Sequence, residues 1–252
     1  MVNVERIKKL LKQYFTVTGN TIVNANTGEV TVSGNVEYFE PSLRELPVKF
    51  AQVNTFLIQN AHGLKTLQGV PKIAKSFTIN DAPLLENLQG VPHTMSNFAC
   101  LNCNNLKTLQ GAESIVVHNM MLDNLPITTL EGCPPQVLDI FQVSKCKMLE
   151  SLKGSPARVK GDFYLLNTPI TSLTRGPDWV GGRYVISPYN ENLGLLPTLV
   201  AQKGIRFYEK NNQAQDVSRI MSDERWRGKG KSNMLNCANE LKKNKHMGNA
   251  RW

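Results

Sequence analysis

The residues that could carry chemistry are few. Cys100 and Cys103 have the spacing of a zinc-knuckle or redox pair, but no second cysteine pair or histidine pair follows at a matching distance. The five cysteines form no disulfide pattern, and their odd number fits a reducing compartment. We expect no metal site, and we expect Cys100 to pack as a small apolar side chain in a core strand.

Catalytic constellations are also missing from the sequence. None of the four histidines stands in a His-x-x-His or nucleophile-elbow context, and no glycine-rich phosphate loop is present. Acidic residues such as Glu86 and Glu150 form no recurring pair that would suggest a general acid and base. The sequence therefore predicts no catalytic residue, no cofactor and no enzymatic activity.

A basic segment around an aromatic ring is the candidate nucleic-acid site. Its cations could neutralise phosphates while its indole ring stacks on a base. A solvated linker between two packed helices would explain the same segment. The candidate residues are Arg225, Trp226, Arg227, Lys229 and Lys231.

The net charge of +9 is unevenly distributed along the chain. Residues 1–15 hold four basic side chains and one acidic, residues 16–200 hold 13 and 14, and residues 201–252 hold 12 and five. This distribution predicts a neutral central scaffold whose ends, above all the last quarter, meet an acidic partner.

A repeat of 21 or 22 residues dominates the sequence. Its signature is Leu-x-x-Leu-x-Gly-x-Pro, as in 64–71 and 85–92. The repeated glycines are Gly69, Gly90, Gly111, Gly132, Gly154 and Gly176. An alternating segment about eight residues after each glycine, such as 77–79 or 119–121, predicts a short strand with one buried face. Because so short a strand cannot bury its apolar face alone, the copies are predicted to stack into a parallel sheet with one continuous core.

The predicted fold class is α+β, a β-solenoid built as a leucine-rich-repeat-like stack with short parallel strands. We expect residues 1–48 to form an amphipathic helix and a β cap, 49–200 the solenoid, and 201–252 a basic helical extension. Apolar residues at helical spacing predict the helix over 4–15, and turn signals predict a pair of hairpins over 16–38. A helix that binds a membrane surface or nucleic acid is the alternative to the cap.

The combined signature, Phe-x-Cys/Ile-x-Asn followed by Leu-x-x-Leu-x-Gly-x-Pro, resembles the short-period leucine-rich-repeat-like proteins of tailed bacteriophages and some bacteria. The resemblance covers roughly residues 30–187, with 34–36 and 43–47 resembling a degenerate cap. It implies an architecture and a phage origin, with the host cytoplasm or the virion as location, but no catalytic motif. The third repeat departs from the pattern, because Ala112-Glu113 replaces its Val-Pro step.

The strand pattern also predicts a binding face. If the repeated phenylalanines point inward, the residues after them point outward and form two uncharged rows. The first row is Thr78, Ala99, Met120, Gln142, Tyr164 and Val185. The second row is Asn80, Leu101, Leu122, Ser144, Leu166 and Ser187.

Such a face would prefer a protein to nucleic acid, since phosphates need cations. We therefore expect a non-enzymatic protein that binds a host or viral protein, with no membrane partner. Two alternatives are a structural part of a virion or other assembly, and a nucleic-acid-associated protein that acts through its basic C-terminal extension.

Overall fold

The computed structural model describes residues 2–209, 211–227 and 231–252. The chain forms two compact units, Met1–Ile127 and Thr128–Trp252, which we call the N-terminal unit and the C-terminal unit. Both contain stacked parallel strands, so the predicted β-solenoid is confirmed. Within the described residues, no helix is both long enough and apolar enough to cross a lipid bilayer.

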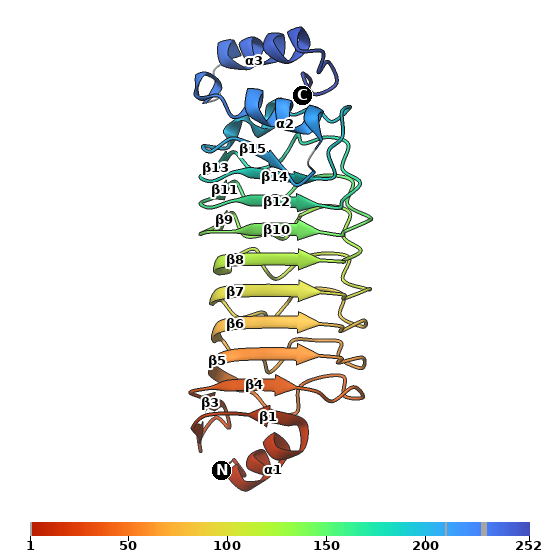
Figure 1. Cartoon of the computed structure of the whole chain (residues 1–252). Coiled ribbons are helices and arrows are strands. Elements are labelled where there is room, and N and C mark those ends of the chain that lie inside the picture. Colours follow the sequence, from red (N-terminus) through yellow and green to blue (C-terminus); the bar gives the residue numbers. More distant parts are fainter. Residues whose placement is uncertain (1, 210, 228–230) are drawn as a thin grey trace. The chain divides into compact units, whose positions relative to one another are not determined.

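The N-terminal unit begins with a helix and continues as a sheet. Strands β4 to β8 lie side by side as parallel neighbours, and β1 joins the sheet antiparallel to β4 (Figure 1). The elements are α1 (Val4–Tyr14), β1 (Phe15–Val17), β2 (Thr21–Val23), β3 (Val30–Val32), β4 (Asn35–Tyr38), β5 (Phe50–Gln59), β6 (Ile73–Asn80), β7 (Thr94–Leu101) and β8 (Val116–Asp123).

The cap at the start of the chain contains the predicted helix and one of the two predicted hairpins. Asn3 caps α1, because its side-chain oxygen accepts a hydrogen bond from the backbone N–H of Arg6 at 2.9 Å. Strands β2 and β3 form an antiparallel hairpin, whereas β1 pairs with β4 outside it. The two pairings are therefore nested, and the prediction of two consecutive hairpins was wrong for β1 and β4.

Aromatic rings and leucines fill the core of the N-terminal unit. Phe77 and Phe98 occupy the same position in successive turns, and their stacked rings lie 6.0 Å apart. The leucines of the repeat signature are all at most 1% exposed behind these rings, as predicted. They are Leu64, Leu67, Leu85, Leu88, Leu106 and Leu109. Each turn therefore buries its apolar side chains largely against the turns next to it.

Each long strand of this unit is followed directly by a residue with a left-handed backbone. Asn60, Asp81, Asn102 and Asn124 have φ between 53° and 57°, a region that Asn and Asp tolerate better than most residues. The amide of Asn102 donates to the side-chain oxygen of Asn80, and the amide of Asn124 donates to that of Asn102, both at 2.8 Å. Side-chain amides therefore form a ladder beside the sheet.

The repeated glycines keep successive turns close together. Gly111 has φ +104°, and a Cβ atom there would lie 2.4 Å from the backbone nitrogen of Gln89 in the preceding turn. A side chain at this position would strain the local backbone of Gly111 and would collide with the backbone of Gln89.

Among the described residues, the C-terminal unit contains two parallel sheets, two α-helices and two 3₁₀ turns. Strands β10, β12, β14 and β15 form one sheet, and β9, β11 and β13 form the other. The elements are β9 (Gln136–Val137), β10 (Phe141–Ser144), β11 (Arg158–Val159), β12 (Phe163–Leu166), β13 (Trp179–Val180), β14 (Tyr184–Ser187), the 3₁₀ turn η1 (Leu196–Val200), β15 (Ile205–Phe207), α2 (Asn212–Met221), the 3₁₀ turn η2 (Glu224–Trp226) and α3 (Lys231–Lys243).

Parallel pairing extends beyond the predicted solenoid boundaries of 49 and 200. In the N-terminal unit β3 and β4 already pair in parallel with β5, and in the C-terminal unit β15 pairs in parallel with β14. Helix α2 then packs on β15, where the Ser218 hydroxyl donates to the carbonyl of Ile205 at 2.7 Å. The region after residue 200 is therefore part strand and part helix.

Replacing Phe98 with alanine should destabilise the fold by about 3–5 kcal/mol, because it removes a buried ring from a continuous stack. Urea unfolding followed by circular dichroism would measure this change. The exposed Glu86→Ala variant is the control and should stay within about 0.5 kcal/mol of the parent. A loss below about 1 kcal/mol for Phe98→Ala would contradict a stacked core.

Alkaline pH should destabilise the N-terminal unit through Tyr38. Its hydroxyl is buried without a hydrogen-bond partner among the described residues, and burial raises its pKa to about 12. A tyrosine in the unfolded chain ionises near pH 10. The contribution of the neutral Tyr38 side chain to folding stability is therefore complete below about pH 10 and is lost as the pH rises towards 12. Equilibrium unfolding followed as a function of pH should give a higher alkaline midpoint for Tyr38→Phe than for the parent. The control Tyr14→Phe should have the same midpoint as the parent.

Candidate binding surfaces

The N-terminal unit exposes one face of its long strands. Strand register places Leu57, Thr78, Ala99 and Met121 in one outward row. A second row contains Gln59, Asn80, Leu101 and Asp123. The outward orientation predicted for Thr78, Ala99 and Leu101 is confirmed, since all three are partly exposed.

The orientation predicted for Met120 and Leu122 was wrong. Met120 is 1% exposed beside Phe98, and Leu122 is fully buried beside Cys100. Our prediction placed the inward residue eight positions after the glycine, but in this repeat it stands nine positions after Gly111. Because side chains alternate with a period of two, a shift of one residue exchanges the two faces.

The C-terminal unit exposes the outward face of β10, β12, β14 and β15. Its first outward row is Gln142, Tyr164, Val185 and Arg206. Gln142, Tyr164 and Leu166 are partly exposed, as predicted, whereas Val185 is only 2% exposed and offers little surface.

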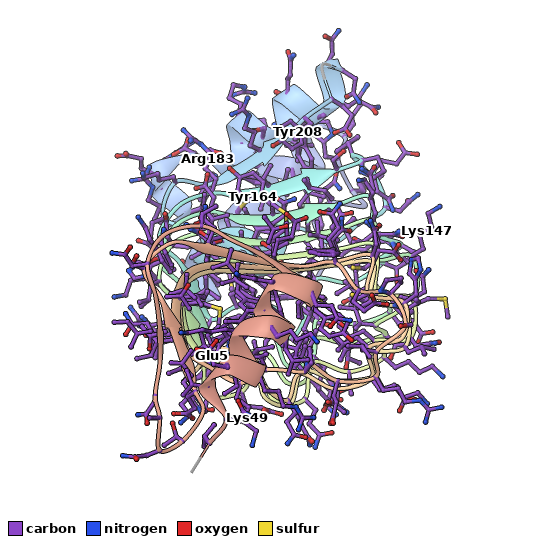
Figure 2. The ribbon with its side chains drawn as sticks, turned by 90° about the horizontal axis from the view of Figure 1, so that it is seen from below. Glu5, Lys49, Lys147, Tyr164, Arg183 and Tyr208 are labelled. Atoms are coloured by element: carbon purple, nitrogen blue, oxygen red, sulfur yellow. The ribbon has the colours of Figure 1, made fainter. Side chains whose placement is uncertain are left out.

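Tyr164, Leu166, Arg206 and Tyr208 together form what we call the tyrosine–arginine face. Tyr208 is 53% exposed, and the Arg206 guanidinium lies 6.0 Å from the centre of its ring. Figure 2 shows Tyr164 and Tyr208 on the same side of this unit, with Lys147 on another side.

Tyr164 is held in place and kept neutral by its surroundings. Its hydroxyl donates to a carboxylate oxygen of Asp162 at 3.2 Å. Partial burial raises its pKa, the nearby Asp162 charge adds to the rise, and the Arg206 charge opposes it. The phenol therefore presents a neutral ring, while Arg206 supplies the positive charge of the face.

Sequence reasoning missed Arg206 and Tyr208 because it ended the solenoid at residue 200. The alternation Ile205-Arg-Phe207 follows Tyr184-Val-Ile186 by 21 residues, which is the repeat length. The spacing of strands, without the leucine and glycine signature, would have identified this last turn.

The basic segment is largely engaged within the C-terminal unit. Trp226 is 7% exposed, and its indole N–H donates to the carbonyl of Ile220 at 2.8 Å. The candidate stacking ring is therefore buried in the fold, which leaves little of its surface available to a base. The buried indole nitrogen therefore has a hydrogen-bond partner, as a buried tryptophan usually does.

The arginines of this segment form ion pairs with neighbouring acids. Arg225 contacts Asp223 at 2.7 Å and holds the pKa of that carboxyl down at about 2, and Arg227 contacts Glu224 at 3.0 Å. The Arg225 guanidinium also lies 4.7 Å from the centre of the Trp226 ring. Lys229 and the side chain of Lys231 lie outside the described residues.

The cysteine pair lies inside the N-terminal core. The sulfur atoms of Cys100 and Cys103 are 3.8 Å apart and both residues are fully buried, so Cys100 is the core strand residue that we expected. The hydrogen bond from Cys100 lowers the pKa of the Cys103 thiol. Among the described residues, no three potential metal ligands cluster together.

No protein-family model, curated protein or solved structure matches the chain. The chain is a parallel β-solenoid by its own strand pairing.

Fluorescence quenching would test the burial of Trp226. A variant with Trp179→Phe and Trp252→Phe keeps only Trp226, and acrylamide should quench its emission weakly because the ring is buried. A variant with Trp179→Phe and Trp226→Phe keeps only Trp252, which is 61% exposed, and should be quenched strongly. Equal quenching of the two would mean that Trp226 is open to solvent.

Proposed function

We propose that this chain is a non-catalytic binding protein that recognises another protein through the tyrosine–arginine face. The observation that supports this proposal most strongly is the combination of the partly exposed Tyr164 on β12 with the exposed Arg206 on β15 and Tyr208 just after it, two strands along the same sheet. Tyrosine and arginine are enriched among the residues that dominate protein–protein binding energy.

The chemistry of this face favours a protein partner. Leu166 adds apolar surface beside Tyr164, and the Asp162 hydrogen bond limits the freedom of the tyrosine before binding. Side chains that are already ordered lose less conformational entropy in a complex. Arg206 would prefer an acidic or carbonyl-rich patch on the partner.

The partner that we propose is a host or viral protein, met in the host cytoplasm or in the virion. The repeat signature supports this part of the proposal through its resemblance to the phage proteins. The alternative of a nucleic-acid partner gains less support, because Trp226 is buried and its flanking arginines are paired with acids.

A photo-crosslinking amino acid at Tyr164 would test the proposal. In a nuclease-treated lysate of the host or infected cell, a discrete protein adduct should form at Tyr164. The same amino acid at the exposed Lys147 is the control and should give no such adduct. Arg206→Ala should reduce adduct formation about tenfold or more, as expected for an interface hot spot.

Other results would point elsewhere. Equal adducts at Tyr164 and Lys147 would show non-specific contact and would contradict the proposal. An adduct to nucleic acid, formed only without nuclease and weakened steeply by salt, would favour the nucleic-acid alternative. Incorporation into purified particles, with adducts to particle proteins, would identify a virion component.

A further inference from the structure

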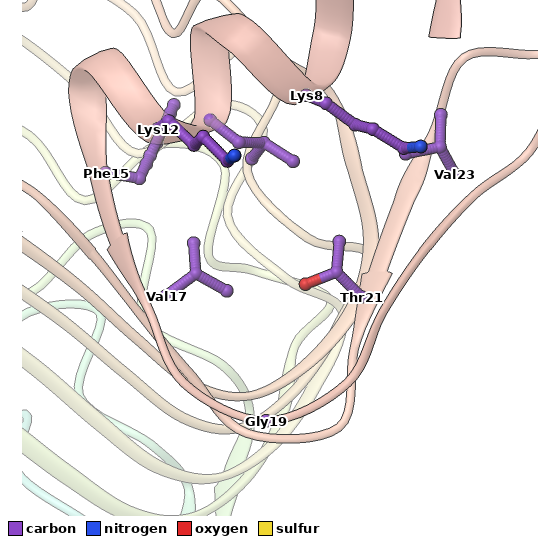
Figure 3. Close-up of a pocket in the computed structure, with 8 residues that line it drawn as sticks. Lys8, Lys12, Phe15, Val17, Gly19, Thr21 and Val23 are labelled. Carbon is purple, nitrogen blue, oxygen red and sulfur yellow. The ribbon is translucent and has the colours of Figure 1, made fainter. Parts of the chain in front are cut away.

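A cavity of about 480 Å³ lies in the N-terminal unit between α1 and the strands β1 and β2 (Figure 3). This volume is within the range of small-molecule sites in proteins. The cavity is lined by Lys8, Leu11, Lys12, Phe15, Val17, Gly19, Thr21 and Val23.

Regular secondary structure produces this lining. The residues from 8 to 15 are spaced at i, i+3, i+4 and i+7, which places them on one face of a helix and its continuation. The residues from 17 to 23 alternate, so they point to one side of β1, its turn and β2. The cavity is therefore bounded by a helix face on one side and a strand face on the other, and it is open to solvent.

Contacts on either side of the cavity keep the helix away from the strands. At the start of the chain, Val2 and Ile7 pack around Gly28, where an added Cβ atom would lie 3.0 Å and 3.3 Å from them. After the helix, the Phe15 ring packs 5.3 Å from Tyr38 and 5.2 Å from Phe50. Between these anchors the apolar wall of the cavity consists of Val17 and Val23, which are partly exposed, and of Leu11, which is only 5% exposed.

Lys8 and Lys12 give this cavity its charge. Helix faces that turn toward a protein are usually apolar, but here two lysines extend over an apolar wall (Figure 3). The described lining residues include no acidic side chain. Lys8 contacts Glu5 at 2.9 Å, but both side chains are more than half exposed and such pairs are weak.

We infer that this cavity binds the anion of a medium-chain fatty acid. The carboxylate would lie between the Lys8 and Lys12 ammonium groups, which supply charge-assisted hydrogen bonds. The Thr21 hydroxyl points into the same space and can donate a further one (Figure 3). The alkyl chain would cover the partly exposed Val17 and Val23, which removes their apolar surface from water.

The occupant follows from the combination of charge and surface. A short anion such as acetate would leave the apolar wall wet, and an uncharged alkane would make no charge-assisted hydrogen bond with the lysine ammonium groups. This inference does not depend on the proposed function, because the cavity and the tyrosine–arginine face belong to different units.

Calorimetric titration of the full chain with hexanoate, octanoate and decanoate, each below its micelle concentration, would test the inference. Saturable binding at one site is expected, and affinity should rise on the order of tenfold for each two added methylene groups. Decyltrimethylammonium, with the same tail and the opposite charge, should not bind.

Matched variants of one helix separate the site from general electrostatics. Lys12→Gln should weaken decanoate binding about tenfold, the size expected for one hydrogen bond to a charged group. Lys9→Gln removes the same charge from a helix position outside the cavity and should leave the affinity unchanged.

Four results would overturn the inference. Three are the absence of saturable decanoate binding, equal weakening by Lys9→Gln and Lys12→Gln, and equal binding of decyltrimethylammonium. The fourth is binding that begins only at the micelle concentration, which would mean adsorption to an aggregate surface.

Discussion

The fold depends on lateral burial between successive turns. A turn of 21 or 22 residues is too short to enclose a core, so each inward side chain is covered by its equivalents in the neighbouring turns. Phe77 and Phe98 show the geometry directly, since their rings stack at the same position of adjacent strands. Parallel strand pairing sets the spacing of turns, and Gly111 allows the backbones of two turns to approach closely elsewhere in the stack.

The need for apolar cover also explains the form of the cap in the N-terminal unit. The first parallel strands need apolar cover at the start of the stack, and Phe15 supplies it by packing on Tyr38 of β4 and Phe50 of β5. Only Leu11 of α1 is buried, so the helix does not seal the layer beneath it. The result is a covered sheet edge with an open, cationic cavity beside it.

Sequence patterns predicted the architecture well and the phase of single strands less well. The leucines and glycines recur at a spacing that only a stack of turns explains, and the structure confirms the solenoid. The predicted inward and outward positions were exchanged at Met120, because the loop after Gly111 is one residue longer than in the preceding repeat. Periodicity cannot show how many residues a loop takes to return to the sheet. Trp226 illustrates a different limit, since its burial depends on contacts with Ile220 and on helix packing that no local pattern encodes.

The amide ladder of the N-terminal unit also bears on how the chain finds its fold. The hydrogen bonds that join Asn80 to Asn102 and Asn102 to Asn124 each span 22 positions along the chain. The loop that must close to add a turn is therefore nearly the same everywhere in this unit, and its entropic cost changes little from turn to turn. A chain built in this way can start folding at any pair of turns and grow by equal steps. The ladder adds a check on register during that growth, because a strand that slips by one position loses its amide partner as well as its core contacts.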